Sequence, residues 1–301
     1  MMTNAVLAIA LAGTAIANQL ASAADDAALS STVSDAPRTP DFLDEWQARV
    51  HAAQESQPHW ITPLATVTPR LEQEVRYDQN EERSFNGGHT DRYGGGKGLE
   101  LIPTSSTEVL INAPSYNDRD TRKPAGGFAD WPFLMVKQRV LSANEEQGNY
   151  IVSVFLGVQA PTGADAFTNH AWVVTPTIAA GKGWGDFDIQ ATAGVPIPAS
   201  HEGDIGTALV TNATCQYHLL RVFWPEVELN TTHWFDGQRG GKTQVYVTPG
   251  LILGRFPLFD NRMRAIVGAG YQYALAPKAT TTPVSTPDYA HAWIFTARLA
   301  F

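Results

Sequence analysis

The feature that most constrains this chain is a period-two alternation of apolar and polar residues, repeated along most of its length. In the last segment, Phe295, Ala297 and Leu299 alternate with Thr296 and Arg298. Side chains two residues apart share a face of a β-strand, so the pattern predicts strands and excludes helices over these stretches. About twelve strands are expected, centred near residues 71, 100, 110, 135, 154, 175, 191, 211, 229, 248, 268 and 296.

Alternation does not say which face points inward, and two architectures compete. A soluble sandwich buries its apolar face, whereas an outer-membrane barrel turns that face to lipid and its polar face to the lumen. Only 17% of the 301 residues are charged, below the roughly 25% of soluble domains. Expected linkers tend to alternate between long (78–96, 114–126, 161–168, 276–288) and short (104–106, 144–148, 181–185, 256–260). Together these observations favour an all-β, antiparallel transmembrane β-barrel over residues 64–301, with ten or fourteen strands as alternatives to twelve.

Aromatic residues fall at the expected strand ends, where amphipathic rings prefer the two membrane interfaces. The long-loop rim would hold Trp131, Trp172, Trp234, Tyr273 and Trp293, and the short-turn rim Trp184, Trp224, Phe256, Phe259 and Phe301. The final alternating strand closes on Phe301, which resembles the recognition signal of bacterial outer-membrane barrels. We therefore expect outer-membrane lipid and the barrel assembly machinery as partners.

The first residues predict export. Residues 5–17 form an apolar run too short for a transmembrane helix, and Ala21-Ser22-Ala23 suits signal peptidase. Residues 1–23 are thus expected to be a signal peptide for export, which together with the barrel pattern predicts location in the bacterial outer membrane. Residues 24–63 form a polar periplasmic leader, in which Phe42, Trp46 and Val50 recur every four residues as in a short amphipathic helix. That helix, with Phe42 and Trp46, is either a plug for the barrel or part of a mobile leader.

Three segments carry a family resemblance. They are residues 127–131 (GFADW) before a basic strand, residues 157–163 (GVQAPTG) after an apolar strand, and residues 186–191 (DFDIQA) with Gly194. The sequence resembles, over about residues 65–301, the outer-membrane transporter family named for the MetA pathway of phenol degradation. The resemblance implies a barrel of this size and a role in moving small, often aromatic, molecules. It implies no catalytic residues.

The function of such a barrel depends on its lumen. Charged residues expected to face the lumen are Arg262, Arg264, Arg298, Lys242, Glu226, Glu228, Asp186 and Asp188. These side chains either set a transverse field that filters a polar solute by charge or pair with one another and brace the wall. Tyr246 and Phe155 face inward by the same parity and would contact an aromatic solute.

Other functions find less support in the sequence. The net charge of −9 argues against nucleic-acid binding, and a single cysteine, Cys215, argues against a cysteine-rich metal site. We expect no cofactor and no metal. A lipid hydrolase remains as an alternative because four histidines could serve it, although no serine has a recognisable spacing: His170, His218, His233 and His291. A structural or adhesive barrel, using loops 78–96 and 276–288, is the other alternative.

Overall fold

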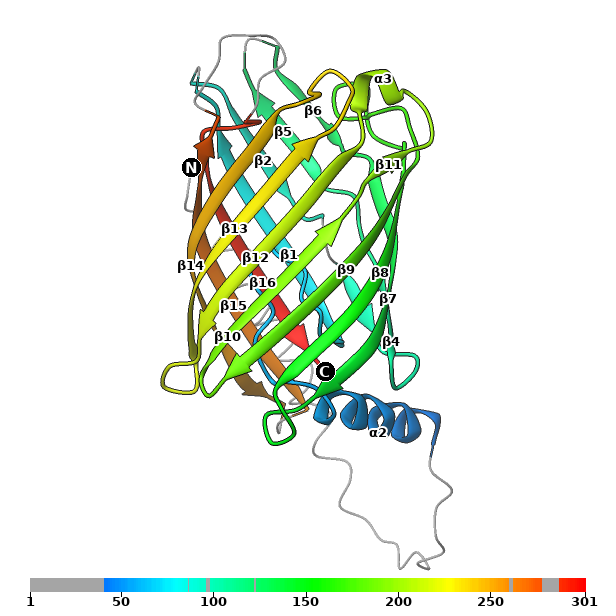
Figure 1. Cartoon of the computed structure of the whole chain (residues 1–301), viewed down its shortest axis with the longest axis vertical. Helices are drawn as coiled ribbons and strands as arrows, with labels where there is room; N and C mark the ends of the chain where they lie inside the picture. The colour runs from blue at the N-terminus through cyan, green and yellow to red at the C-terminus, as the bar shows by residue number, and fades with distance from the viewer. Residues whose placement is uncertain (1–40, 86, 96–97, 122, 260–261, 278–286) are drawn as a thin grey trace, which may run out of the picture. The chain divides into compact units, whose positions relative to one another are not determined.

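The computed structural model describes residues 41–85, 87–95, 98–121, 123–259, 262–277 and 287–301. The chain divides into two units, residues 1–41 and residues 42–301. The expected signal peptide and most of the first unit lie outside the described residues. The described part of the second unit contains two helices and a β-barrel (Figure 1).

The second unit begins with α2 (Phe42–Glu55), and a short helix, α3 (Glu202–Ile205), lies in a loop. The strands are β1 (Glu74–Arg83), β2 (His89–Tyr93), β3 (Leu99–Leu101), β4 (Thr107–Ile111), β5 (Tyr116–Asp120), β6 (Ala125–Phe128), β7 (Trp131–Ala143), β8 (Tyr150–Ala160), β9 (Val173–Trp184), β10 (Phe187–Gly194), β11 (Ile197–Pro198), β12 (Ala208–Tyr217), β13 (Phe223–Trp234), β14 (Thr243–Leu258), β15 (Met263–Ala276) and β16 (His291–Ala300).

Within the described residues, these strand segments make twelve antiparallel passes. Four passes consist of two successive segments each: β2 with β3, β4 with β5, β6 with β7, and β10 with β11. The barrel closes because β16 pairs with β1 from Ala300 opposite Glu74 to His291 opposite Arg83. Closure leaves no edge strand. A sheet that spans a membrane must be closed, because an open edge would expose unpaired backbone groups to lipid. The predicted all-β transmembrane barrel of about twelve strands is confirmed.

The orientation of the two strand faces is also as predicted. In β13, Glu226 and Glu228 are 4% and 0% exposed, whereas Val227 and Leu229 are 51% and 44% exposed. The apolar face therefore points outward and the polar face lines the lumen, the reverse of a soluble sandwich. Among the described residues, no helix is both long enough and apolar enough to span a bilayer.

Two expected loops belong instead to the barrel wall. Residues 78–96 contain the end of β1 and all of β2, and residues 114–126 contain β5 and the start of β6. These strands escaped prediction because both of their faces are polar, as in Asp78-Gln79-Asn80-Glu81-Glu82-Arg83. The barrel wall also begins only at Glu74, although the barrel was expected from residue 64 with its first strand centred near residue 71.

The aromatic side chains follow the predicted girdles with two exceptions. Trp172, Trp184 and Trp293 are 49%, 56% and 47% exposed on the outer surface. Trp224 is 2% exposed and points inward, because it shares strand parity with Glu226 and Glu228. Trp234 is 9% exposed, and the guanidinium of Arg239 lies 4.9 Å from its ring centroid.

Candidate functional site: a plugged lumen

The lumen is occupied by residues 57–73, the segment between α2 and β1, which we call the plug. All of these residues are described, and they form neither helix nor strand. Side chains of β4, β7, β8, β10, β13, β14 and β16 donate or accept hydrogen bonds with it. A segment that reaches strands all around a closed barrel must lie inside it.

Acidic side chains of the wall accept hydrogen bonds from the plug main chain. Glu226 Oε1 accepts from Leu64 N at 3.1 Å. The two carboxylate oxygens of Glu228 accept from Ala65 N at 2.7 Å and Thr66 N at 2.6 Å. Because the plug has no strand partner, these carboxylates satisfy N–H groups that would otherwise be buried without an acceptor.

Basic side chains of the wall donate to the plug carbonyls. Arg298 donates to Thr62 O at 2.5 Å and Pro63 O at 2.8 Å. Lys137 Nζ donates to Arg70 O at 2.7 Å, and Arg255 Nη2 donates to Trp60 O at 2.7 Å. These lumen charges therefore bind the main chain of the plug, and Lys137 also pairs with Glu108 of a neighbouring pass. Acids bind plug N–H groups and bases bind plug C=O groups, so both signs are needed to hold one extended segment.

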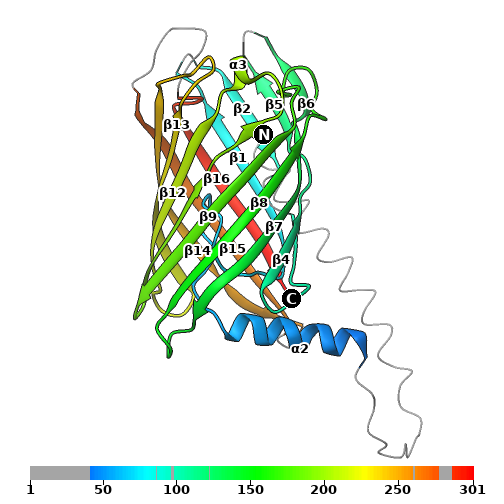
Figure 2. The same cartoon turned by 45° about the vertical axis from the view of Figure 1, so that its right-hand side comes forward.

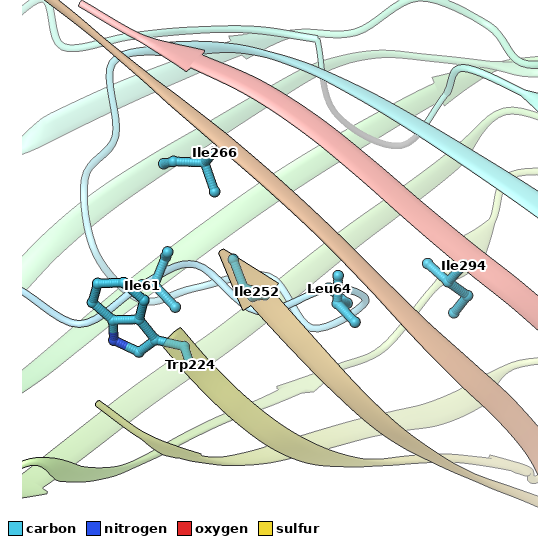
Figure 3. Packing of buried hydrophobic residues seen from close by; sticks show 6 residues of the cluster. All are labelled: Ile61, Leu64, Trp224, Ile252, Ile266 and Ile294. Atoms are coloured by element: carbon cyan, nitrogen blue, oxygen red, sulfur yellow. The ribbon is translucent and has the colours of Figure 1, made fainter. Parts of the chain in front are cut away.

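An apolar contact lies at the centre of the plug. Ile61 and Leu64 pack with Trp224, Ile252, Ile266 and Ile294 of the wall (Figure 3). Gly268 and Gly270 make room for this contact, because a Cβ atom built on each would lie 2.8 Å and 2.7 Å from the methyl carbons of Leu64. The wall is thus shaped to accept this one leucine.

The start of the plug is fixed at the short-turn end of the barrel. Ser142 Oγ donates to Ser56 O at 2.7 Å, and the N and Nδ1 of His59 lie 2.6 Å and 2.8 Å from the carboxylate oxygens of Glu145. Burial acts to raise the pKa of Glu145, but the hydrogen bonds from His59 outweigh it, and the pKa is lowered. Glu145 therefore stays ionised above this lowered pKa and holds the plug at its entry.

Cavities lie on both sides of the plug. One of about 370 Å³, towards the long loops, is lined by Leu64, Ala65, Val67, Arg76, Asp78, Asn80, Arg92, Gly94, Gly95, Ser115 and Ile294. Another of about 190 Å³, at the short-turn end, is lined in part by Arg70, Glu72, Arg255 and Arg264. Residues of the plug line both cavities, and the two cavities share no lining residue.

Beyond the plug, towards the long loops, part of the wall is polar but uncharged. Asn230 bridges its neighbours, donating to Asn212 Oδ1 at 2.9 Å and accepting from Gln272 Nε2 at 3.0 Å. Tyr246 stacks on Tyr289 with ring centroids 4.6 Å apart and planes 21° apart. This region therefore carries hydrogen-bonded amide side chains and two stacked aromatic rings.

The predicted lumen residues divide into three groups. Those that the structure buries inside the lumen are Arg298, Glu226, Glu228, Asp188, Tyr246 and Phe155. Arg264 is exposed and lines the cavity at the short-turn end. The prediction is wrong for Asp186, Arg262 and Lys242, which lie just before β10, β15 and β14 respectively, outside the strands. The alternating pattern in the sequence continues beyond the ends of these strands. The sequence therefore predicted a longer barrel wall than the structure has.

The structure corrects the identity of the expected plug. Phe42 is 65% exposed and Trp46 is half-buried against Gln73 at the barrel rim, so α2 lies outside the lumen. The segment after the helix enters the barrel instead. Its prolines at positions 58, 63 and 69 are the sequence signal that could have identified it, because proline cannot donate to a strand ladder.

Two functional contacts were missed from the sequence. Arg255 is the extra residue of a β-bulge, since Gly254 and Phe256 pair with adjacent residues Ile266 and Ala265. Its positive φ of 61° redirects the side chain to the plug. The second is the ion pair of Lys137 Nζ with Glu108 Oε1 at 2.9 Å, with both side chains 0% exposed. Parity alone reveals neither a bulge nor a partner on a neighbouring pass.

The four histidines considered for a hydrolase lie next to aromatic rings, a threonine and another histidine. His218 stacks on Trp224 at 4.2 Å, and His291 stacks on Tyr271 at 5.5 Å. His233 Nδ1 lies 2.8 Å from Thr243 Oγ1, and the His170 ring lies 6.5 Å from that of His201. Within the described residues, no group of three or more His, Cys, Asp and Glu side chains could hold a metal ion.

Comparison with known proteins gives one family match. The family model described as "Putative MetA-pathway of phenol degradation" matches residues 90–278. A comparison with curated proteins gives no match.

Solved outer-membrane barrels are similar to the chain at low identity. The COG4313 outer membrane channel from Pseudomonas putida F1 is 12% identical with a TM-score of 0.49, covering 80% of this chain and 99% of that one. The NanC porin is 9% identical with a TM-score of 0.47, covering 76% and 98%. The KdgM porin, solved with disordered oligogalacturonate, is 10% identical with a TM-score of 0.41, covering 75% and 99%.

Proposed function

Because the chain belongs to the family described as "Putative MetA-pathway of phenol degradation", we propose that it is an outer-membrane channel for the passive passage of small molecules, aromatic ones among them. One observation carries this proposal. The segment that fills the lumen forms no part of the wall, and wall side chains hold it by hydrogen bonds and packing. The lumen can therefore open without breaking any strand pair.

The stacked rings of Tyr246 and Tyr289 support an aromatic solute. They lie towards the long loops, beyond the plug, and Tyr246 is 5% exposed. A ring-shaped solute can pack against such faces, and aromatic contacts contribute about 0.5–1.5 kcal/mol beyond burial. The neighbouring amides of Asn230 and Gln272 hydrogen-bond to each other, and a hydroxyl or carboxylate substituent binds them by replacing that bond.

Uptake into proteoliposomes tests this function. We expect benzoate to enter faster than an uncharged sugar of similar size, and neither to enter protein-free vesicles at that rate. The Tyr246→Ala and Tyr289→Ala double variant should lower the benzoate preference about three- to tenfold, as the energy of aromatic contacts implies. The Tyr246→Phe and Tyr289→Phe double variant keeps both rings and should keep the preference. Equal entry with and without the protein would contradict the channel, whereas an unchanged preference in the alanine variant would contradict only the aromatic contact.

A further inference from the structure

The helix α2 carries an apolar stripe along one side. With about 100° between successive helical residues, Leu43, Val50 and Ala53 all lie within about 60° of Trp46 around the helix. Phe42 lies on the same side, one turn before Trp46. Asp44, Glu45 and Glu55 lie about 100° or more away. The helix is therefore amphipathic, with its acidic residues opposite the stripe.

Part of this stripe packs on the barrel rim. Val50 and Ala53 are 5% and 1% exposed and pack with Leu71 and Ile102, with Trp46 beside them. Trp46 Nε1 donates to Gln73 Oε1 at 3.0 Å, and Arg49 Nη1 donates to Pro103 O at 3.0 Å. These contacts fix which side of the helix faces the barrel.

The same contacts place the helix at the level of the short-turn aromatic girdle. The main-chain oxygen of Gln73 accepts from Phe301 N at 3.1 Å, while its side chain accepts from Trp46. Phe301 is 39% exposed at the end of the last strand. Exposed aromatic rings at strand ends mark the membrane interface of such barrels, so the stripe lies near that interface.

The first turn of α2 continues the stripe beyond the rim. Phe42 and Leu43 are 65% and 63% exposed, although they share the side of the helix that is buried further along. In both views of the molecule, the first turn reaches past the outline of the barrel wall (Figures 1 and 2). Further along the helix, the apolar side of α2 faces the barrel rim. Where the first turn extends past the rim, the same side faces the adjacent membrane surface.

We propose that this first turn inserts Leu43, with Phe42 beside it, into the periplasmic leaflet of the outer membrane. The inference rests on the proposed membrane setting of the channel and adds a lipid contact to it. The surface is continuous with the established contact between helix and rim, and the acidic residues of the helix point to water. Because α2 leads directly into the plug, the leaflet then holds the outer end of the segment that closes the lumen.

Site-specific labelling tests this contact in the full-length protein. A polarity-sensitive fluorophore is attached at Leu43→Cys or, as the matched control two residues along the same turn, at Glu45→Cys. Both variants carry Cys215→Ser and are reconstituted in phosphatidylethanolamine vesicles with a minor fraction of phosphatidylglycerol. Lipids with a spin label just below the headgroup should reduce the Leu43 emission at least about twofold and leave the Glu45 emission nearly unchanged. Aqueous iodide should show the opposite preference.

Two outcomes overturn the proposal. Equal quenching of both labels by iodide would show that the first turn lies in water. Shielding of the Leu43 label from both quenchers would show that protein covers the stripe, either residues preceding α2 or a second copy. Heat-modifiable migration on gels establishes that each variant has folded. Because this measurement requires no solute passage, absence of the lipid contact can be distinguished from absence of channel activity.

Discussion

Deletion of residues 42–70, which removes α2 and most of the plug, should raise the single-channel conductance on the order of tenfold. The expected increase follows from the position of the plug, which lines both cavities and packs between the wall isoleucines. A barrel of this size has room for a narrow water-filled path once that space is vacated. Planar-bilayer recording of the purified variant measures the change.

A second variant keeps this prediction testable if the deletion impairs folding. Glu226→Ala with Glu228→Ala leaves the plug in the chain but removes the acceptors for Leu64 N, Ala65 N and Thr66 N. Hydrogen bonds to charged groups contribute about 1.5–3 kcal/mol each, so the open fraction should rise at least about tenfold. The exposed pair Glu146→Ala with Glu202→Ala makes the same chemical change outside the lumen and should have no effect. If both lumen variants conduct like the wild type, the plug does not close the channel.

Lys137→Met should lower the free energy of unfolding by about 3–5 kcal/mol, because it leaves the Glu108 carboxylate buried without its cation. The same change removes the donor to Arg70 O, which anchors the plug. Urea titration in detergent micelles, followed by tryptophan emission, measures the loss.

Two further variants identify the cause of that loss. Adding Glu108→Gln removes the uncompensated charge but keeps an acceptor for Glu72 N, so it should restore much of the stability. Arg239→Met breaks an ion pair at the surface, in which the side chains of Arg239 and Asp288 are 28% and 41% exposed. It should lower the free energy of unfolding by about 1 kcal/mol or less. A loss no larger for Lys137→Met than for Arg239→Met would show that the buried charge is not decisive.

The wall of the barrel was predictable because its signal is local. In β13, Glu226 and Val227 occupy opposite faces simply by being adjacent, and the same parity repeats along each pass. The alternating linker lengths, the aromatic residues at strand ends and the final strand ending on Phe301 then favoured the barrel over the sandwich. The upper part of β1 was not predictable in this way, because residues 78–83 are polar on both faces and carry no alternation.

The plug was not predictable from alternation because nearly all its side chains are buried. Residues near Leu71 show a polar and apolar pattern like that of a strand, yet their partners are side chains on distant passes. The charged residues of the lumen were identified by parity, but their role depends on main-chain groups that sequence does not reveal. The inward-facing glycines at positions 250, 268 and 270 are a sequence feature that indicates the plug, since they leave space for Leu64.

Reversible tethering of the plug to the wall tests the central claim most directly. A Cβ atom built on Gly270 lies 2.7 Å from Leu64 Cδ1, so the thiols of Leu64→Cys and Gly270→Cys, in a Cys215→Ser background, lie within reach of a short bis-methanethiosulfonate cross-linker, which a reductant cleaves. Single-channel current is recorded from the same reconstituted molecules before and after addition of a reductant. We predict that the cross-linked protein stays closed and that cleavage of the cross-link by the reductant restores openings. Equal conductance and open time in the two states would contradict the account, because the channel would then conduct with its plug fixed in place.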